Sequence, residues 1–312
     1  MVKGEHADFL TGQHRNHGCR LRDVTWQGYR CLSLENAHLR VVVCPDKGCD
    51  ILELTHKPSD TEVLYQSPWG LGSPHDRHTA APCGPFRDRF AGGWFLMLPN
   101  GPERCSHKGA DFGHHGEASQ LAWSVAITDD RPERIEVVFR VRLRRMPLWV
   151  ERRLSLERGD DRLAIAETIG NEGAEELDVL WGHHPCLGEP FLDVDCRIHL
   201  PDGTEIGLDA PVNDFRAIAA TKGCVTVSNP RLGLDFTLTW DEKLFPVMGL
   251  WRVWDAGEGY PNYRSRRILA VEPAVDFPSL SAAVERGTAL VLMPGETRST
   301  VLTAQITQKA KA

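Results

Sequence analysis

Apolar and polar residues alternate along much of the chain. The clearest stretches cover residues 29–45, 135–146, 148–158, 162–171 and 234–241. A repeat of two residues is typical of β-strands with one buried face. Residues 148–171 resemble a long antiparallel hairpin whose turn lies near Gly159 and Asp160. Residues 280–287 have the only helical pattern, and it is short.

These elements predict an all-β fold. Turns rich in Gly, Pro and Asp separate the expected strands at short intervals, which favours a sandwich or a barrel. The chain contains no internal repeat, no low-complexity tract and no Pro/Ser linker. We therefore predict one domain over residues 1–312, with its core at about residues 20–308.

Composition and charge exclude several classes of protein. The 312 residues are 41% hydrophobic and 25% charged, as in ordinary globular domains. A net charge of −7 argues against a general nucleic-acid binder, which needs a basic excess. No apolar run approaches the about 18 residues of a membrane span, and the polar first 16 residues lack a signal-peptide core. Nine scattered cysteines without a CxxC pair predict reduced thiols in the cytoplasm.

Four polar stretches between the expected strands are candidates for chemistry. They contain Arg87, Arg89 and Asn100; His114, His115 and Glu117; His183 and His184; and Glu272. Glu272 follows an apolar run and precedes Pro273, so partial burial would raise its pKa unless a cation lies nearby. A carboxyl group with a raised pKa beside a histidine can exchange protons near neutral pH.

The two His-His pairs raise the alternative of a metal site, as in cupin-type isomerases. Neighbouring side chains on a strand point to opposite faces. His183 and His184 are therefore not expected to share one metal, and the same reasoning applies to His114 and His115. We predict no metal and no other cofactor. Taken singly, each histidine also fits a half-buried, hydrogen-bonded side chain.

A set of short motifs occurs in a recognisable order. They are DRFAGGWF (88–95), NGP (100–102), HHGEA (114–118), HHPCLGEPF (183–191), AVEP (270–273) and LMPGETRSTVLT (292–303). In this order, over about residues 35–306, the chain resembles a divergent bacterial branch of the aldose 1-epimerase (galactose mutarotase-like) superfamily. The resemblance implies a β-supersandwich of large antiparallel sheets.

The resemblance also implies roles for individual residues. His184 corresponds to the general acid and Glu272 to the general base, while His115 and Arg89 correspond to residues that contact the sugar. Asn100 and Trp254 are further candidates for sugar binding. The family's aspartate that grips sugar hydroxyls has no clear counterpart, although Asp214 lies in the expected region.

The predicted activity is mutarotation, the exchange of the α and β anomers of a monosaccharide or sugar derivative by acid–base ring opening. These roles predict that exchange falls at low pH as Glu272 gains a proton and at high pH as His184 loses one. Three alternatives stay open: a non-catalytic carbohydrate-binding or sensor protein, a carbohydrate hydrolase or lyase, and a metal-dependent isomerase.

The predicted partner is a small sugar, and no nucleic acid or membrane is expected. Arg264, Arg266 and Arg267 are candidates for binding an anionic group on that sugar, the alternative being a solvated strand edge. A homodimer is compatible with these features.

Overall fold

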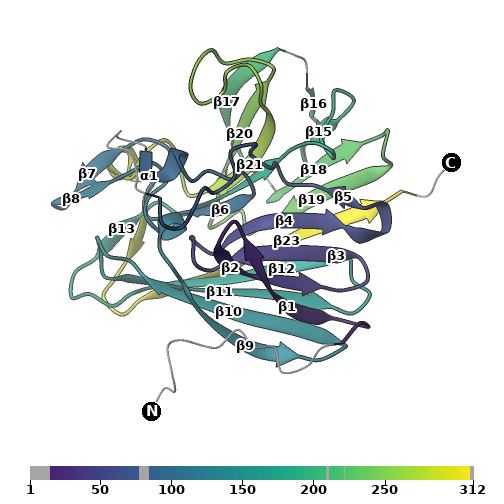
Figure 1. The fold of residues 1–312 in the computed structure, drawn as a ribbon. Coiled ribbons are helices and arrows are strands. Elements are labelled where there is room, and N and C mark those ends of the chain that lie inside the picture. Colours follow the sequence, from purple (N-terminus) through teal and green to yellow (C-terminus); the bar gives the residue numbers. More distant parts are fainter. Residues whose placement is uncertain (1–14, 77–83, 209–210, 221, 310–312) are drawn as a thin grey trace.

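The computed structural model describes residues 15–76, 84–208, 211–220 and 222–309 (Figure 1). Within these residues two large antiparallel sheets, of ten and nine strands, make up most of the molecule. The ten-stranded sheet contains β1 (Arg20–Trp26), β2 (Tyr29–Glu35), β3 (Leu39–Cys44), β4 (Asp50–His56), β6 (Trp94–Met97), β14 (Gly182–Leu187), β21 (Arg267–Ala274), β20 (Val247–Trp254) and β17 (Val212–Ala219), in this spatial order, with β5 (Thr61–Glu62) paired to β4.

The nine-stranded sheet lies behind it and is built mainly from later parts of the chain. Its spatial order is β16 (Glu205–Gly207), β15 (Arg197–His199), β18 (Cys224–Asn229), β19 (Leu234–Thr239), β23 (Thr297–Gln308), β12 (Arg162–Asn171), β11 (Leu148–Glu157), β10 (Arg134–Arg142) and β9 (Ser124–Asp130). The all-β prediction and the expectation of large antiparallel sheets are confirmed. The one-domain organisation stays a prediction.

Smaller elements complete the described chain. They are the strand pairs β7 (Cys105–His107) with β8 (Ala110–Phe112) and β13 (Leu177–Val179) with β22 (Leu290–Leu292), the helices α1 (Gly84–Arg87) and α2 (Leu280–Arg286), and 3-10 turns at Lys57–Ser59 and Ala118–Gln120.

Local sequence explains where several elements begin and end. The predicted hairpin forms as β11 and β12, which pair from Leu148 opposite Asn171 to Ser155 opposite Ala164. The predicted helical segment is α2. The Ser279 side chain caps its first turn by accepting the Ala282 N–H, and Gly287 ends it in a left-handed conformation.

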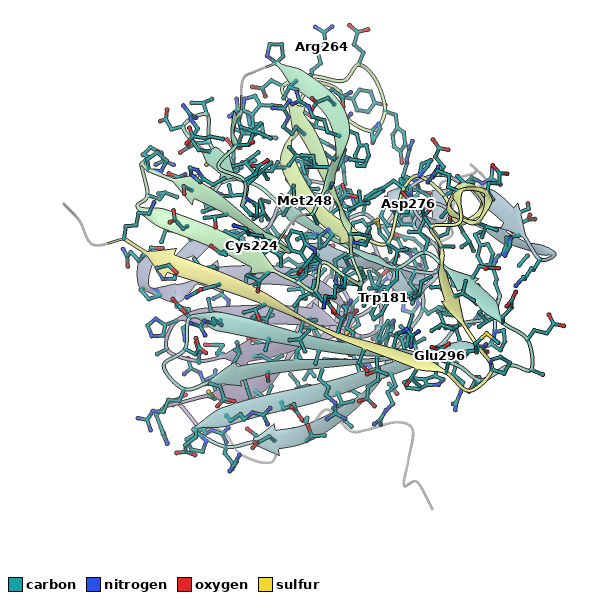
Figure 2. All side chains as sticks on the ribbon, turned by 180° about the vertical axis from the view of Figure 1, so that it is seen from behind. Trp181, Cys224, Met248, Arg264, Asp276 and Glu296 are labelled. Atoms are coloured by element: carbon teal, nitrogen blue, oxygen red, sulfur yellow. The ribbon has the colours of Figure 1, made fainter. Side chains whose placement is uncertain are left out.

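The two sheets enclose a large apolar core. Strand alternation directs Leu269 and Val271 of β21 into this core, together with Trp181, which Figure 2 shows near the centre of the molecule. Ile268 and Ala270 of β21 point the other way and belong to a second apolar cluster. The central strands of the ten-stranded sheet are therefore apolar on both faces, and the outer face has to be covered by connecting segments.

Two further sequence expectations concern cysteines and membranes. The eight cysteines of the described residues are free thiols, and the ninth, Cys83, lies outside those residues. None of the helices in the described chain has the length and apolar character needed to cross a membrane.

Candidate active site

The outer face of the ten-stranded sheet holds a cavity of about 370 Å³. This volume lies at the small end of the range for ligand pockets, about 300–1,000 Å³, and suits a molecule of monosaccharide size. Its aromatic lining consists of Phe86, Phe90, Phe95, Phe215 and Trp251. Its polar lining consists of Arg87, Glu103, His114, His115, His184, Arg266 and Glu272. Apolar rings with a few convergent polar groups are the usual composition of a small-molecule site.

Strand register brings His184 and Glu272 together. β14 pairs with β21 at Gly182–Ala274 and at Cys186–Ala270, so His184 and Glu272 lie level with each other between these pairs. Both side chains point to the outer face, where His184 Nε2 lies 3.2 Å from Glu272 Oε1. Two residues that are 88 positions apart in the sequence thus form one contact at the floor of the cavity.

Neighbouring strands fix the positions of this pair. On β6, Phe95 lies opposite His184 and its ring stacks on the imidazole at 4.3 Å between centroids. On β20, Gly249 lies opposite Glu272. A side chain at Gly249 would place a Cβ only 3.1 Å from the Glu272 Cβ and 2.9 Å from the Phe215 ring, so glycine keeps the space beside the carboxyl group open.

The carboxyl group of Glu272 is buried, with 2% of the residue exposed. Burial raises its pKa to about 8, because no cation compensates for the lost hydration. Burial has the opposite effect on His184 and lowers its pKa to about 3. Both groups therefore favour their neutral forms, and the pair retains one proton between about pH 3 and pH 8.

A tight turn adds two more histidines. His115 has a left-handed backbone, and the following Gly116 is so close to Leu98 that a Cβ would lie 2.2 Å from its carbonyl oxygen. As a result His114 and His115 both line the cavity, their rings 4.0 Å apart. The expectation that they point to opposite faces of a strand is wrong, because this segment is a turn. Burial lowers the pKa of both histidines.

Asn100 supports this turn and does not line the cavity. It is fully buried, its side-chain amide donates to the carbonyl oxygens of Glu103 at 2.7 Å and Gly113 at 2.9 Å, and its oxygen accepts the Leu280 N–H. Asn100 thus connects the segment that carries His115 to the start of α2. The structure supports a positioning role for Asn100 and does not bring it to the cavity as a sugar ligand.

Two other predicted residues lie away from the cavity lining, and so does Asp214, which is in the region where the family's aspartate is expected. The Arg89 guanidinium points to the carbonyl oxygens of Pro74 and Asp76, each at 3.5 Å. Trp254 is buried in the core between the sheets, and Trp251 on the same strand lines the cavity in its place. Asp214 accepts two hydrogen bonds from Arg252, at 2.9 and 2.7 Å, while its neighbour Phe215 lines the cavity.

The first histidine of the HHP motif has a different environment from the second. His183 points into the core between the sheets, where its Nε2 lies 3.1 Å from Glu167 Oε2 and its Nδ1 accepts the Trp94 indole N–H at 3.3 Å. Glu167 also accepts a 2.5 Å hydrogen bond from the buried Arg152. The expectation that His183 and His184 point to opposite faces is confirmed.

The described residues contain no group of three or more His, Cys, Asp or Glu side chains arranged to hold a metal ion. Glu117, from the same polar stretch as His114 and His115, accepts hydrogen bonds from the backbone N–H groups of Arg144 at 3.1 Å and Arg145 at 2.9 Å. It contributes to loop structure and does not line the cavity.

Comparison with protein families gives one match. The model described as Domain of unknown function (DUF4432) matches residues 26–213, more than half of the chain. The chain belongs to this family. The matched region includes His115 and His184 but ends before Glu272. The carboxyl group beside His184 therefore comes from a part of the chain that follows the match. No curated protein matches the DUF4432 chain by sequence.

Solved structures with the same fold are numerous. A "putative aldose 1-epimerase" from Klebsiella pneumoniae subsp. pneumoniae MGH 78578 has a TM-score of 0.75 at 15% identity, covering 93% of this chain and 88% of that one. A galactose mutarotase-like protein from Clostridium acetobutylicum has a TM-score of 0.64 at 14% identity, covering 94% and 99%. Another galactose mutarotase-like protein, from Lactobacillus casei ATCC 334, has a TM-score of 0.62 at 13% identity, covering 89% and 100%. The DUF4432 chain therefore has the galactose mutarotase-like fold, as its motifs predicted.

Proposed function

We propose that this DUF4432 protein is a mutarotase, which interconverts the α and β anomers of a monosaccharide or sugar derivative. Glu272 and His184 form its acid–base pair, and His115 contacts the sugar. The observation that carries the proposal is the 3.2 Å contact between Glu272 and His184 on the floor of a cavity of monosaccharide size.

The geometry of the pair suits the atoms that react. Ring opening removes the proton from the C1 hydroxyl and adds a proton to the ring oxygen, and both oxygens are bonded to C1. Two proton-transfer groups in contact with each other can therefore reach both atoms of one sugar. Rotation about the C1–C2 bond and closure on the other face of the carbonyl group then give the other anomer.

The number of protons in the pair also suits the reaction. One group has to accept a proton while the other donates one, so the pair must hold one proton in total. Before the sugar binds, that proton resides on Glu272, since burial favours the neutral form of both groups. Glu272 acts as base and His184 as acid once the proton has crossed to the imidazole, and the roles reverse when the ring closes.

The other functions fit the cavity less well. A glycoside hydrolase uses two carboxyl groups about 5–9.5 Å apart on either side of the scissile bond. In this site the nearest partner of Glu272 is an imidazole, and the second carboxylate in the lining, Glu103, belongs to an exposed residue. A sensor protein needs no proton-transfer pair.

Anomer exchange measured by NMR tests the proposal. The purified protein is added to equilibrated glucose, galactose, glucose 6-phosphate and glucuronate, and magnetisation exchange between the α and β anomers is recorded. The proposal predicts exchange that rises in proportion to protein concentration for at least one sugar. Binding of a sugar without faster exchange would support a sensor instead.

A further inference from the structure

Three arginines near the start of β21 differ in their partners. Arg264 is exposed over 64% of its side chain and pairs with Glu258, and Figure 2 shows it at the outer edge of the molecule. Arg267 pairs with Asp255 at 2.9 Å and with Glu189 at 2.8 Å. Arg266 lies between them in sequence, is 5% exposed, and has no ion pair or hydrogen bond with any described residue.

An arginine in this situation has an energetic cost. A guanidinium group stays charged at any pH a protein tolerates, and burying it without a carboxylate partner is unfavourable. The ring of Phe90, 5.8 Å from the Arg266 guanidinium, compensates only a small part of this cost. Such a charge suits a site whose occupant supplies the missing anion.

Arg266 lines the same cavity as the acid–base pair. It precedes β21, and Ile268 and Ala270 separate it from Glu272 on the outer face of that strand. Its charge also acts on Cys186, where it opposes the rise in thiol pKa that burial causes. The Cys186 sulfur lies 3.1 Å from His184 Nδ1. Arg266 is thus placed to contact a part of the substrate away from C1.

We propose that Arg266 binds an anionic oxygen group on the substrate, so that the substrate is a sugar phosphate, a sugar acid or a sugar sulfonate. This inference rests on the proposed function for the identity of the sugar. The anion site itself follows from the buried Arg266, which has no ion pair with any residue that the structure describes, and needs no turnover to be tested.

The charges around the cavity agree with an anionic occupant. Arg87, on an exposed part of α1, also lines it. Burial keeps Glu272 and His184 neutral near pH 7, and the other carboxylate in the lining, Glu103, is exposed to water, which screens its charge. A protein with a net charge of −7 therefore presents a locally positive cavity.

The first experiment measures anion binding without catalysis. Thermal unfolding of the wild type, Arg266→Gln and Arg264→Gln is followed with and without inorganic phosphate. The wild type and Arg264→Gln are expected to gain at least about 2 °C in Tm with saturating phosphate. Arg266→Gln is expected to gain nothing and, without phosphate, to be at least as stable as the wild type, because it lacks the unpaired charge. Equal phosphate effects in all three proteins, or none in any, would overturn the anion site.

The second experiment measures the substrate preference. We expect kcat/KM for glucose 6-phosphate or glucuronate to be about 10- to 100-fold higher than kcat/KM for glucose. This factor corresponds to the usual contribution of a hydrogen bond to a charged group. Arg266→Gln should remove this preference and Arg264→Gln should retain it. Exchange of glucose with no preference in the wild type would contradict the inference and leave the mutarotase proposal intact. Stabilisation by phosphate without anomer exchange of any sugar would support the anion site and contradict the mutarotase proposal.

Discussion

β14 places two histidine–glutamate contacts on opposite faces of one sheet. On the inner face, His183 Nε2 lies 3.1 Å from a Glu167 oxygen. On the outer face, His184 Nε2 lies 3.2 Å from a Glu272 oxygen. All four residues are buried. Distance and burial are nearly equal, yet the pKa values of the two carboxyl groups are shifted in opposite directions.

The difference comes from a third residue. Burial alone would raise the pKa of Glu167, but Arg152 and His183 outweigh that effect and hold the pKa at about 2. Glu272 has no such cation, and burial raises its pKa to about 8. A buried carboxylate with an arginine is a fixed part of the core. The same group without one retains a proton that it can transfer near neutral pH.

The largest expected effect is a loss of catalysis when the outer contact, between His184 and Glu272, is changed. Glu272→Gln and His184→Asn should each lower anomer exchange by about 10²–10⁴-fold, since each removes one proton-transfer group from a pair that acts together. The double variant should be little slower than either single one. Exchange is measured by NMR with the preferred sugar. Near-wild-type rates in either single variant would show that the wrong residues are assigned.

Folding stability should respond in the opposite way. Glu167→Gln leaves Arg152 buried without its carboxylate and should lower the free energy of unfolding by about 3–5 kcal/mol. Glu272→Gln removes no ion pair with a cation and should change it by less than about 1 kcal/mol at pH 5. Urea denaturation of both variants checks this. Equal losses would mean that the Glu272 contact is structural as well.

The pH dependence of stability should distinguish the two carboxyl groups again. The raised pKa of Glu272 stabilises the folded protein below about pH 4.5, and this contribution is lost as pH rises to about 8. The lowered pKa of Glu167 acts in the other direction, with stability lost as pH falls from about 4.5 to about 2. Between pH 5 and pH 8 the wild type should therefore lose at least about 1 kcal/mol relative to Glu272→Gln. Urea denaturation measures this. If the difference in unfolding free energy between the wild type and Glu272→Gln were the same at pH 5 and pH 8, the raised pKa of Glu272 would be contradicted.

The pH profile of exchange should follow the number of protons in the outer pair. Exchange should fall above about pH 8, where Glu272 loses the last proton, and below about pH 3, where His184 gains a second one. The sequence-based expectation assigned the two limits to the opposite groups, because it did not include burial of the histidine. A decline centred near pH 6.5 would indicate that His184 is exposed to water.

The smallest expected effect is that of chelation. Exchange after extensive dialysis against EDTA should equal exchange before it, since the proposed steps are proton transfers between side chains and sugar. A loss that added divalent ions restore would favour a metal-dependent isomerase.

The ordered motifs singled out two residues that the structure brings together in one cavity. The resemblance named His184 and Glu272, and both lie on regular strands, where a period of two keeps their side chains on the face that holds the cavity. Their catalytic roles stay a prediction. The same period explains why Trp254 does not line the cavity. Trp254 and Trp251 lie on opposite faces of β20, and the sequence does not show which face carries the cavity.

Residues on turns and loops were harder to predict. The left-handed backbone at His115 brings His114 into the lining, and no periodic pattern indicates that conformation. Arg89 and Arg266 are chemically identical, and their neighbours in the fold decide which one lines the cavity. An arginine-rich loop was the available signal for Arg266, but the ion pairs of Arg264 and Arg267 were needed to single it out.

The central claim is that Glu272 carries a proton at neutral pH and Glu167 does not. Infrared spectroscopy reports this directly, because the carbonyl band of a protonated carboxyl group is separate from the bands of a carboxylate. The account predicts a band at pH 7 whose intensity falls in Glu272→Gln and is unchanged in Glu167→Gln measured below its unfolding temperature, the remainder belonging to groups such as Glu62, whose pKa burial raises to about 7. Absence of the band in the wild type, or an equal intensity in the wild type and Glu272→Gln, would contradict the account.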